Sequence, residues 1–239
     1  MKVDLQGYTD IGGRIENEDC PGYRKHGPNV TAVIADGLGG QGDGGDASRS
    51  VCKSLLRDEP KNTLMTREEI LALFDEANRE LISQQKNSFH MKTTAVFLCI
   101  ADNKAVWAHI GDSRLYHLFN GSIIHYTLDH SASQLAVYMG KITRDEIPGD
   151  AGRSRLLHAM GIENEVPDIH DPITLDAGTH VFLLCSDGLW EYLSDKEIES
   201  AWNGTKTADS FIEALRKIKA AKSPPDCDNN SAVVVHLEV

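Results

Sequence analysis

The spacing of apolar residues changes period along the chain, and each period predicts a kind of element. Residues 30–35 are almost continuously apolar, which is typical of a strand covered on both faces. Helical spacing follows, and residues 46–57 are predicted to form a helix with Asp46 as its N-cap. A second helix is predicted to begin at Thr66, because apolar residues then recur on one face at helical spacing.

Between residues 94 and 126 the apolar period becomes two, which predicts strands with alternating faces. Asn120-Gly121 separates two such runs and is a strong hairpin signal, and Asp102-Asn103 joins another pair. The predicted strands are 94–100, 105–110, 114–119 and 122–126. The middle of the chain is therefore expected to be a meander of antiparallel strands.

Beyond the meander, residues 135–161 are charged and carry only a weak helical pattern, so we expect an excursion from the sheet there. The later predicted elements are a buried strand at 181–185, helices at 195–202 and 208–221, and a closing strand at 232–237. Helices thus flank a block of antiparallel strands. This differs from the alternating strands and helices of a parallel, nucleotide-binding sheet.

Composition places the chain among acidic globular proteins. Its 239 residues suit one large domain, and 41% apolar residues are enough for a sizeable core. A net charge of −12 repels phosphate backbones and argues against nucleic acid as a partner. We find no secretory leader and no run of eighteen apolar residues, and the five scattered cysteines form no C-x-x-C pair. We therefore expect a cytoplasmic protein without membrane contact.

A glycine-rich stretch directly follows the first apolar strand. Residues 37–42 fit the pattern G-x-G-x-x-G, which by itself indicates a dinucleotide site. Asp36 precedes these glycines, however, and Asp43 and Asp46 follow them. Three carboxylates around one loop repel a phosphate unless cations lie between. The loop is therefore expected to hold a cation first and a phosphate second.

Other acidic residues also lie where apolar sequence meets a turn, so the end of a sheet can gather them. The acids are Glu18, Asp19, Asp36, Asp112, Asp187 and Asp228. Carboxylates without a matching set of histidines or cysteines favour Mg²⁺ or Mn²⁺ over zinc. Two such ions about 3.5–4 Å apart can activate a shared water for in-line attack on phosphorus. Arg14 is a candidate for binding the phosphate oxygens. An isolated Asp-Gly is more often a surface turn, so that interpretation stays open here.

Taken in order, the short motifs of this chain resemble those of the metal-dependent protein serine/threonine phosphatases of the 2C type, in their compact bacterial form. The resemblance extends over nearly the whole chain. It rests on Thr9-Asp10-Ile11-Gly12 with Arg14, Asn17-Glu18-Asp19, Ala35-Asp36-Gly37-Leu38-Gly39-Gly40, Thr93-Thr94, Gly111-Asp112-Ser113-Arg114, Asp129-His130-Ser131, Ser186-Asp187-Gly188-Leu189 and Asp228-Asn229.

The resemblance implies an α+β fold of four layers, in which two mainly antiparallel sheets pack face to face with helices outside both. It also implies a centre of two Mn²⁺ or Mg²⁺ ions. Asp36 would bridge the two ions, the Gly37 carbonyl would bind one of them, and Asp187 and Asp228 would bind the other. Arg14 would bind the substrate phosphate. The attacking species would be a metal-bridging hydroxide, without a phospho-enzyme intermediate.

Further roles follow from the same resemblance. Glu18 and Asp19 would act mostly through metal-bound waters, and Asp112 would hold a weaker third metal together with Asp187. The whole chain, 1–239, would be one phosphatase domain, and residues 135–161 would form a flap beside the site. The expected substrates are phosphorylated proteins, either the targets of a cognate Ser/Thr kinase or the kinase itself. A monomer is the expected state.

The sequence departs from the family pattern at two positions of the glycine-rich stretch. Leu38 replaces the usual methionine, and Gln41 replaces a frequent histidine, although neither position is a ligand in the pattern. Animal members carry a histidine at the position of Leu38, often assigned as the general acid. Its absence leaves the protonation of the leaving group unassigned.

Three single residues or residue types also allow a rival interpretation. Cys185 is not the nucleophile of a cysteine phosphatase, because Glu191 occupies the place of the required arginine. His130 is expected to be a structural hydrogen-bonding residue, and the histidines show no zinc spacing. Arg114 fits an ion pair with a nearby acid at least as well as a phosphate contact.

Two other functions compete with catalysis. A catalytically silent protein that binds phosphoproteins would keep the fold, but such members typically lose one of the acids Asp36, Asp187 and Asp228, which are all present here. A nucleotide-binding oxidoreductase needs parallel strands, which the predicted hairpins do not provide.

Overall fold

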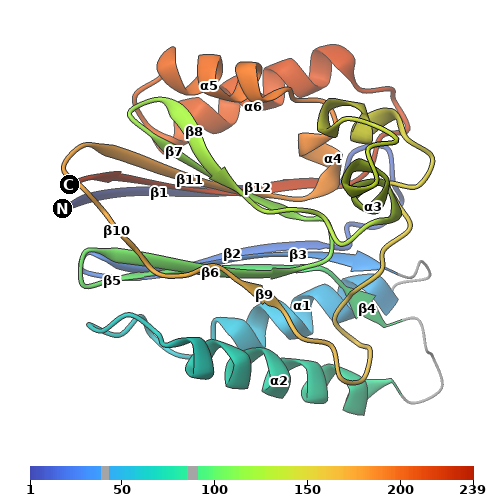
Figure 1. The fold of residues 1–239 in the computed structure, drawn as a ribbon, viewed down its shortest axis with the longest axis horizontal. Coiled ribbons are helices and arrows are strands. Elements are labelled where there is room, and N and C mark those ends of the chain that lie inside the picture. Colours follow the sequence, from blue (N-terminus) through green and yellow to red (C-terminus); the bar gives the residue numbers. More distant parts are fainter. Residues whose placement is uncertain (39–42, 86–90) are drawn as a thin grey trace.

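A computed structural model describes residues 1–38, 43–85 and 91–239, which fold into four layers, helices–sheet–sheet–helices (Figure 1). All paired strands are antiparallel. The first sheet has the order β1 (Lys2–Asp10), β12 (Asn230–Glu238), β11 (Thr179–Cys185), β7 (Arg114–Phe119) and β8 (Ser122–Tyr126). The second has the order β10 (Ile173–Thr174), β6 (Lys104–Ile110), β5 (Ala95–Ala101), β3 (Asn29–Leu38) and β2 (Asp19–His26), with β4 (Lys92–Thr93) paired to β3 and β9 (Asp168–Ile169) paired to β6.

Helices cover the outer face of each sheet. The first sheet is covered by α5 (Asp195–Asn203) and α6 (Ala208–Lys222), and the second by α1 (Asp43–Leu55) and α2 (Arg67–Gln84) (Figure 1). The α+β sandwich expected from the sequence is therefore confirmed. No helix in 1–38, 43–85 or 91–239 combines the length and apolarity that a bilayer crossing needs.

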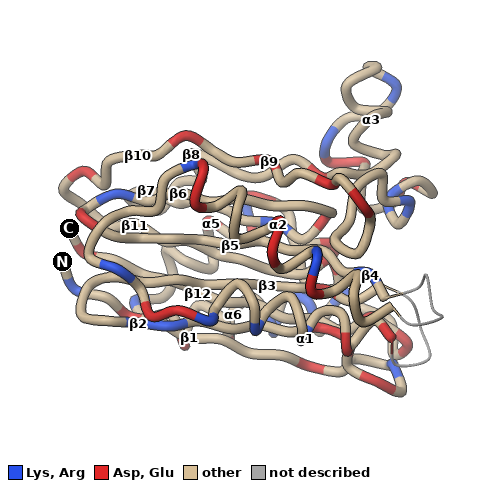
Figure 2. Tube along the Cα trace, turned by 90° about the horizontal axis from the view of Figure 1, so that it is seen from below, with Lys and Arg blue, Asp and Glu red and all other residues tan. Residues whose placement is uncertain are grey.

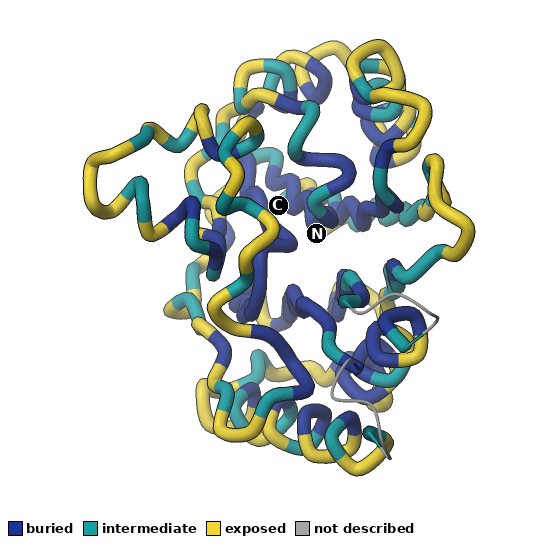
Figure 3. Tube along the Cα trace, turned by 90° about the vertical axis from the view of Figure 1, so that its right-hand side faces the viewer, coloured by how far each residue is buried: buried dark blue, intermediate teal, exposed yellow. Residues whose placement is uncertain are grey.

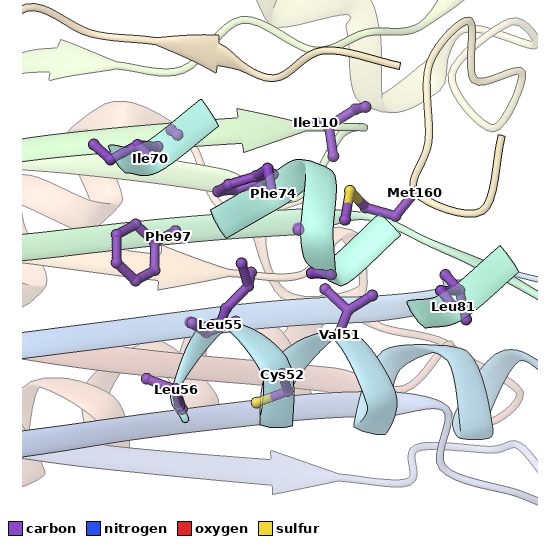
Figure 4. Packing of buried hydrophobic residues seen from close by; sticks show 14 of the residues in the cluster. Val51, Cys52, Leu55, Leu56, Ile70, Phe74, Leu81, Phe97, Ile110 and Met160 are labelled. Carbon is purple, nitrogen blue, oxygen red and sulfur yellow. The ribbon is translucent and has the colours of Figure 1, made fainter. Parts of the chain in front are cut away.

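Side chains of the central strands point alternately to the two faces of the sheet and pack into two different apolar layers. Val33 and Phe97 point to the helical side, where Phe97 meets Phe74 of α2 edge to face at 6.4 Å between ring centroids (Figure 4). Their neighbours in the strands, such as Ile34, face the other sheet and pack in a cluster with Phe182 of β11. Each fully buried side chain of this size contributes roughly 1.5–3 kcal/mol. This buried cluster holds the two sheets together.

Local turn chemistry produces the predicted hairpins. Asp102 and Asn103 have φ of 51° and 55°, and Asn120 and Gly121 have φ of 48° and 91°. Two consecutive left-handed residues match the right-handed twist of the strands they join, and Asn, Asp and Gly tolerate that conformation best. The two predicted hairpins are confirmed, but the prediction of one meander was wrong. β5 and β6 pair in the second sheet, whereas β7 and β8 pair in the first, so the chain crosses from one sheet to the other between Ile110 and Arg114.

The sequence predicted the start of α2 correctly and the start of α1 wrongly. Thr66 caps α2 with a capping box completed by Glu69, as the sequence indicated. The prediction for α1 was wrong, because the helix begins at Asp43 and Asp46 lies within its first turn. The Asp46 side chain binds Arg49 one turn later at 2.7 Å instead of capping the helix. Residues 39–42, with Gln41 of the glycine-rich stretch, lie outside the described residues.

The segment 135–161 leaves the sheets at the end away from the chain termini (Figure 1 and Figure 2). It contains most of α3 (Ala132–Tyr138) and a 3₁₀ turn at Arg144–Gly149, and Figure 2 labels α3 on a part that projects beyond the strands. The segment returns through Met160, whose backbone forms two hydrogen bonds with Thr93. Both chain termini lie at the opposite end of the sheets (Figure 1).

Candidate metal centre

Four carboxylates from different parts of the chain meet at the end of the sheets away from the termini. Asp19 of β2 and Asp36 of β3 are direct partners across the strand ladder. Asp187 begins α4 (Asp187–Trp190) two residues after β11 ends, and Asp228 lies two residues before the neighbouring β12 begins. The Asp36 carboxyl lies close enough to those of Asp19 and Asp187 for their charges to raise its pKa. Figure 3 looks onto this end, where buried strand ends from both sheets lie between exposed loops.

The electrostatics of this cluster favour bound protons or bound cations. Desolvation, followed by repulsion from Asp19, Asp187, Asp112 and Asp228, raises the pKa of Asp36 well above its usual range. Desolvation also raises the pKa of Asp187 to about 7. It raises the pKa of Asp19 to about 6, although hydrogen bonds from serines oppose this shift. Carboxyls this close cannot all ionise without positive charge between them.

Two threonines fix the end of β3. The backbone N–H of Thr94 donates to the Asp36 carbonyl at 2.8 Å, and the Thr94 hydroxyl accepts from the Asp36 N–H at 3.0 Å. The Thr93 hydroxyl donates to the same carbonyl at 2.8 Å. The Thr93-Thr94 motif therefore positions Asp36 and is not itself part of the acidic cluster.

Glycines allow the strand ends to approach one another. A Cβ atom on Gly37 would lie 2.2 Å from the carbonyl oxygen of Gly44, where α1 begins. A Cβ on Gly188 would lie 2.0 Å from the carbonyl oxygen of Asn229. Any side chain at either position would push the neighbouring backbone away. Close packing therefore requires glycine after each of these two aspartates. The contact at Gly188 also brings Asp187 and Asp228 together.

The donor set fits hard divalent cations. Glu18 Oε1 and Asp19 Oδ1 are buried and have no hydrogen-bond partner among the described residues. Buried polar atoms are normally satisfied, so two orphaned carboxylate oxygens beside a carboxylate cluster point to a missing positive partner. All side-chain donors here are oxygen atoms, which Mg²⁺, Mn²⁺ and Ca²⁺ prefer.

Asp112 joins the cluster through Asp187. Its side chain is buried, and desolvation followed by repulsion from Asp187 raises its pKa well above the usual range. The indole Nε1 of Trp190, in α4, donates to the Asp112 carbonyl at 2.9 Å. This bond links the turn that carries Asp112 to the short helix that begins with Asp187.

Arg14 lies on a loop at the mouth of the cluster. Its Nη2 binds Asp228 Oδ2 at 2.5 Å, and its side chain is about half exposed. Asn229 anchors this loop at both ends, donating to the carbonyls of Ile11 and Glu16 at 2.8 and 3.0 Å. Arg14, Glu18 and Asp228 line a cavity of about 400 Å³ there. Sequence reasoning placed Asn229 in a motif but missed its anchoring role, which depends on contacts more than 200 residues apart.

All eight residues expected at the site therefore come from segments that meet at this end of the sheets. They are Arg14, Glu18, Asp19, Asp36, Gly37, Asp112, Asp187 and Asp228. Arg114 points elsewhere and forms the expected ion pair, with Asp129. Cys185 is fully buried in the core.

This combination of two helix-covered antiparallel sheets and strand-end carboxylates defines a class of metal-dependent hydrolases, and the comparisons agree. A family model described as Protein phosphatase 2C matches residues 6–226. The serine/threonine phosphatase stp of Listeria monocytogenes serotype 4b is 32% identical over 219 residues, covering 85% of this chain and 86% of its own length.

Solved structures give the same result. The serine/threonine phosphatase of S. agalactiae matches with a TM-score of 0.86 at 25% identity, covering 99% of this chain and 100% of that one. The catalytic domain of the phosphatase PstP, in complex with 2 manganese ions, matches with a TM-score of 0.80 at 29% identity over the full length of both.

The chain belongs to the protein phosphatase 2C family. It is a metal-dependent protein serine/threonine phosphatase, and its substrates are phosphoproteins. Nothing in the comparisons supports a catalytically silent binding protein.

Proposed function

We propose that Asp36, Asp187 and Asp228, with the Gly37 carbonyl, hold two divalent cations for the hydrolysis of phosphoserine and phosphothreonine. The observation that carries this proposal is the convergence of these acids: Asp19 and Asp36 are paired across the strand ladder, and the backbone contact at Gly188 brings Asp187 to Asp228. Negative charge is thereby concentrated at one end of the sheets. The chemistry that such bound cations supply is a water molecule of lowered pKa, oriented for in-line attack on phosphorus. The carboxylates would fix the positions of the cations, and the protonated carboxyl groups would release their protons when the cations bind.

The remaining acids have supporting roles in this proposal. Glu18 and Asp19, which carry buried oxygens without a partner among the described residues, would bind water molecules held by the cations. Asp112 shares a third, weaker cation with Asp187, since these two carboxylates repel one another in the absence of positive charge. The oxygen-only donor set supports Mn²⁺ or Mg²⁺, and the manganese complex of PstP agrees with that choice.

Arg14 binds the phosphate of the substrate in this proposal. Its guanidinium is at the mouth of the cavity and offers a planar pair of N–H donors, the geometry that phosphate oxygens require. In the described structure that guanidinium forms an ion pair with the Asp228 carboxylate. A cation held by Asp228 would compete with Arg14 for this carboxylate, which would leave the guanidinium available to the substrate phosphate.

We further propose that residues 1–239 act as one monomeric, cytoplasmic phosphatase domain, with 135–161 as a flap beside the site. Backbone bonds between Met160 and Thr93 support the flap assignment, because Thr93 also binds the Asp36 carbonyl. The substrates are the targets of a cognate Ser/Thr kinase, or the kinase itself.

The test is turnover of a phosphothreonine peptide by purified protein. We expect activity with Mn²⁺, loss of activity with a chelator, and a decrease of kcat by orders of magnitude in Asp36→Asn. Asp75→Asn, which changes an exposed acid of α2 paired with Arg79, is the matched control and keeps full activity. Turnover that persists without metal, or tight Mn²⁺ binding by the wild type without turnover, would contradict the proposal.

A further inference from the structure

A second group of potential metal ligands lies outside the acidic cluster. His109 is in β6, His130 is in the loop before α3, and Asp168 is in β9. One ligand atom from each residue lies within 4.8 Å of the others. Among residues 1–38, 43–85 and 91–239, no other three histidine, cysteine or acidic residues bring one ligand atom each this close together, and this includes the acids of the carboxylate cluster. The three segments share no member with the carboxylate cluster and show no zinc spacing in sequence.

His109 is prepared to act as a ligand. Its Nε2 lies 2.7 Å from the carbonyl oxygen of Leu128, which can only accept, so the ring proton is on Nε2 and Nδ1 carries a free lone pair. Metal-binding histidines are usually oriented in this way by a bond from the other ring nitrogen. Burial, with the neighbouring His130, lowers the pKa of His109 to about 4, so the ring is neutral at physiological pH, as metal binding requires.

His130 and Asp168 complete the group. His130 Nε2 lies 3.2 Å from Asp168 Oδ2. The His109 and His130 rings stack with centroids 4.7 Å apart and 26° between their planes, so one ring has to turn before both nitrogens can bind the same ion. The Gly111 N–H donates to His130 Nδ1, so without metal the ring proton is on Nε2 and faces Asp168. A cation at Nε2 requires that proton to move to Nδ1. This costs the Gly111 hydrogen bond, which at 3.2 Å is already at the long end of the normal range.

The surroundings provide access for a cation. Asp168 is largely exposed, and a cavity of about 310 Å³ opens onto His130 and Asp168. A fourth ligand, such as water, can therefore enter from solvent. Two neutral imidazole nitrogens and one carboxylate suit Zn²⁺, whereas Mg²⁺ and Mn²⁺ prefer an oxygen-only site such as the carboxylate cluster.

We propose that His109, His130 and Asp168 form a structural site for a borderline divalent cation, with Zn²⁺ as the natural occupant. The cation would join β9 to β6 and to the loop 127–131. This loop precedes the segment 135–161, and β9 follows it, so one ion would fix both ends of the proposed flap to the sheet edge. The site uses no residue of the catalytic centre and does not depend on the proposed mechanism.

The test counts zinc in the wild type and in Asp168→Asn after exposure to Zn²⁺ and removal of free metal. Asp168 is exposed, so this variant is expected to fold normally. We expect the wild type to hold one equivalent of zinc more than the variant. Asp171→Asn, an exposed acid on the same connection, is the matched control and keeps the wild-type count.

Co²⁺ gives a second readout, because a four-coordinate site with nitrogen ligands absorbs visible light far more strongly than a six-coordinate oxygen site. We expect a strong band in the wild type that is absent from His130→Asn and from Asp168→Asn. Equal zinc counts in the wild type and Asp168→Asn, or a Co²⁺ spectrum indifferent to both changes, would overturn the proposal. Mn²⁺-dependent phosphatase activity of Asp168→Asn is expected to be unchanged, so the outcome is independent of the catalytic proposal.

Discussion

The guanidinium of Arg114 and the carboxylate of Asp129 form a bidentate ion pair, with both hydrogen bonds 2.7 Å long. The two side chains are only 6% and 2% exposed. A face of the guanidinium covers the Trp190 ring, 3.4 Å from its centroid, and Trp190 Nε1 donates to the Asp112 carbonyl. The pair therefore braces the turn of Asp112 and the start of α4, which together carry two of the clustered acids.

Removing one partner of this buried pair is expected to be costly. In Asp129→Asn the Arg114 charge stays buried and loses its counter-charge, which typically costs about 3–5 kcal/mol. Urea denaturation measures the loss as a lower free energy of unfolding. The control is Glu213→Gln, because the Glu213–Arg216 pair is exposed and such pairs contribute little. A loss in Asp129→Asn no larger than in Glu213→Gln would contradict the bracing role.

Ser186 is expected to control metal affinity through Asp19. Its hydroxyl donates to Asp19 Oδ2 at 2.7 Å and accepts from the Ser231 N–H at 3.0 Å, so it fixes one carboxylate oxygen. Groups that orient ligands in this way typically contribute about 10–100-fold in metal affinity. We expect a loss of that size in Ser186→Ala, measured as Mn²⁺ binding by calorimetry.

The matched control for this change is Ser54→Ala. Ser54 is a buried serine of α1 that binds Glu80 of α2, away from the acids. We expect Mn²⁺ affinity at the wild-type level in this variant. Equal Mn²⁺ affinities for Ser186→Ala and the wild type would show that Asp19 needs no such support.

Arg14→Met should move two measured quantities in opposite directions. Loss of the guanidinium removes charge-assisted bonds to the phosphate, worth roughly 1.5–3 kcal/mol, so kcat/KM for a phosphopeptide should fall about 10–150-fold. The same change frees Asp228 from a half-exposed ion pair, so Mn²⁺ should bind up to about fivefold more tightly. Steady-state kinetics and calorimetry check the two effects. A variant with weaker Mn²⁺ binding would contradict the competition between Arg14 and the cation.

The hairpins and the positions of the acids could be predicted because their causes are local. Asn120-Gly121 tolerates the left-handed turn on its own, and aspartates such as Asp36 and Asp187 follow continuous apolar strands. The register that pairs Asp19 with Asp36 could not be predicted in this way, since it depends on strand β2, which has no clear apolar pattern. The four-layer arrangement came from the family resemblance and not from periodicity.

Other features were invisible because they join distant residues. Asn229 anchors a loop more than 200 residues away, and Ser186 orients an acid 167 residues before it. The start of α1 at Asp43 was missed because the glycines before Asp46 are poor helix formers, and steric contact between Gly37 and Gly44 brings this turn against β3. The group of His109, His130 and Asp168 gave no sequence signal at all.

A chain of histidines inside the first sheet leads to a prediction about acid stability. His180 Nε2 lies 2.9 Å from the Asp176 carbonyl oxygen, so its proton is there and its Nδ1 accepts from His117 Nε2 at 3.0 Å. His117 Nδ1 is left buried without a partner among the described residues. Burial, followed by repulsion from His180, His125 and His170, lowers the pKa of His117 to about 3.

The lowered pKa of His117 determines how the stability of the fold changes with pH. In the unfolded chain the His117 pKa is near 6.5, so below that pH the unfolded state binds a proton that the folded state refuses. The contribution to stability is fully present above pH 6.5 and is lost as the pH falls toward the folded value. One group of this kind removes about 1.4 kcal/mol per pH unit, or about 2 kcal/mol between pH 7.5 and 5.

His117→Phe is therefore expected to flatten the acid limb of the stability curve. The free energy of unfolding, measured by urea at pH 7.5 and pH 5, should fall by about 2 kcal/mol less in the variant than in the wild type. The difference between the two pH values is the readout, because Phe also removes the hydrogen bond to His180 at both. His26→Gln, a change at an exposed histidine at the end of β2, should keep the wild-type difference. If the free energy of unfolding of His117→Phe falls between pH 7.5 and pH 5 by as much as that of the wild type, the acid instability arises elsewhere in the chain.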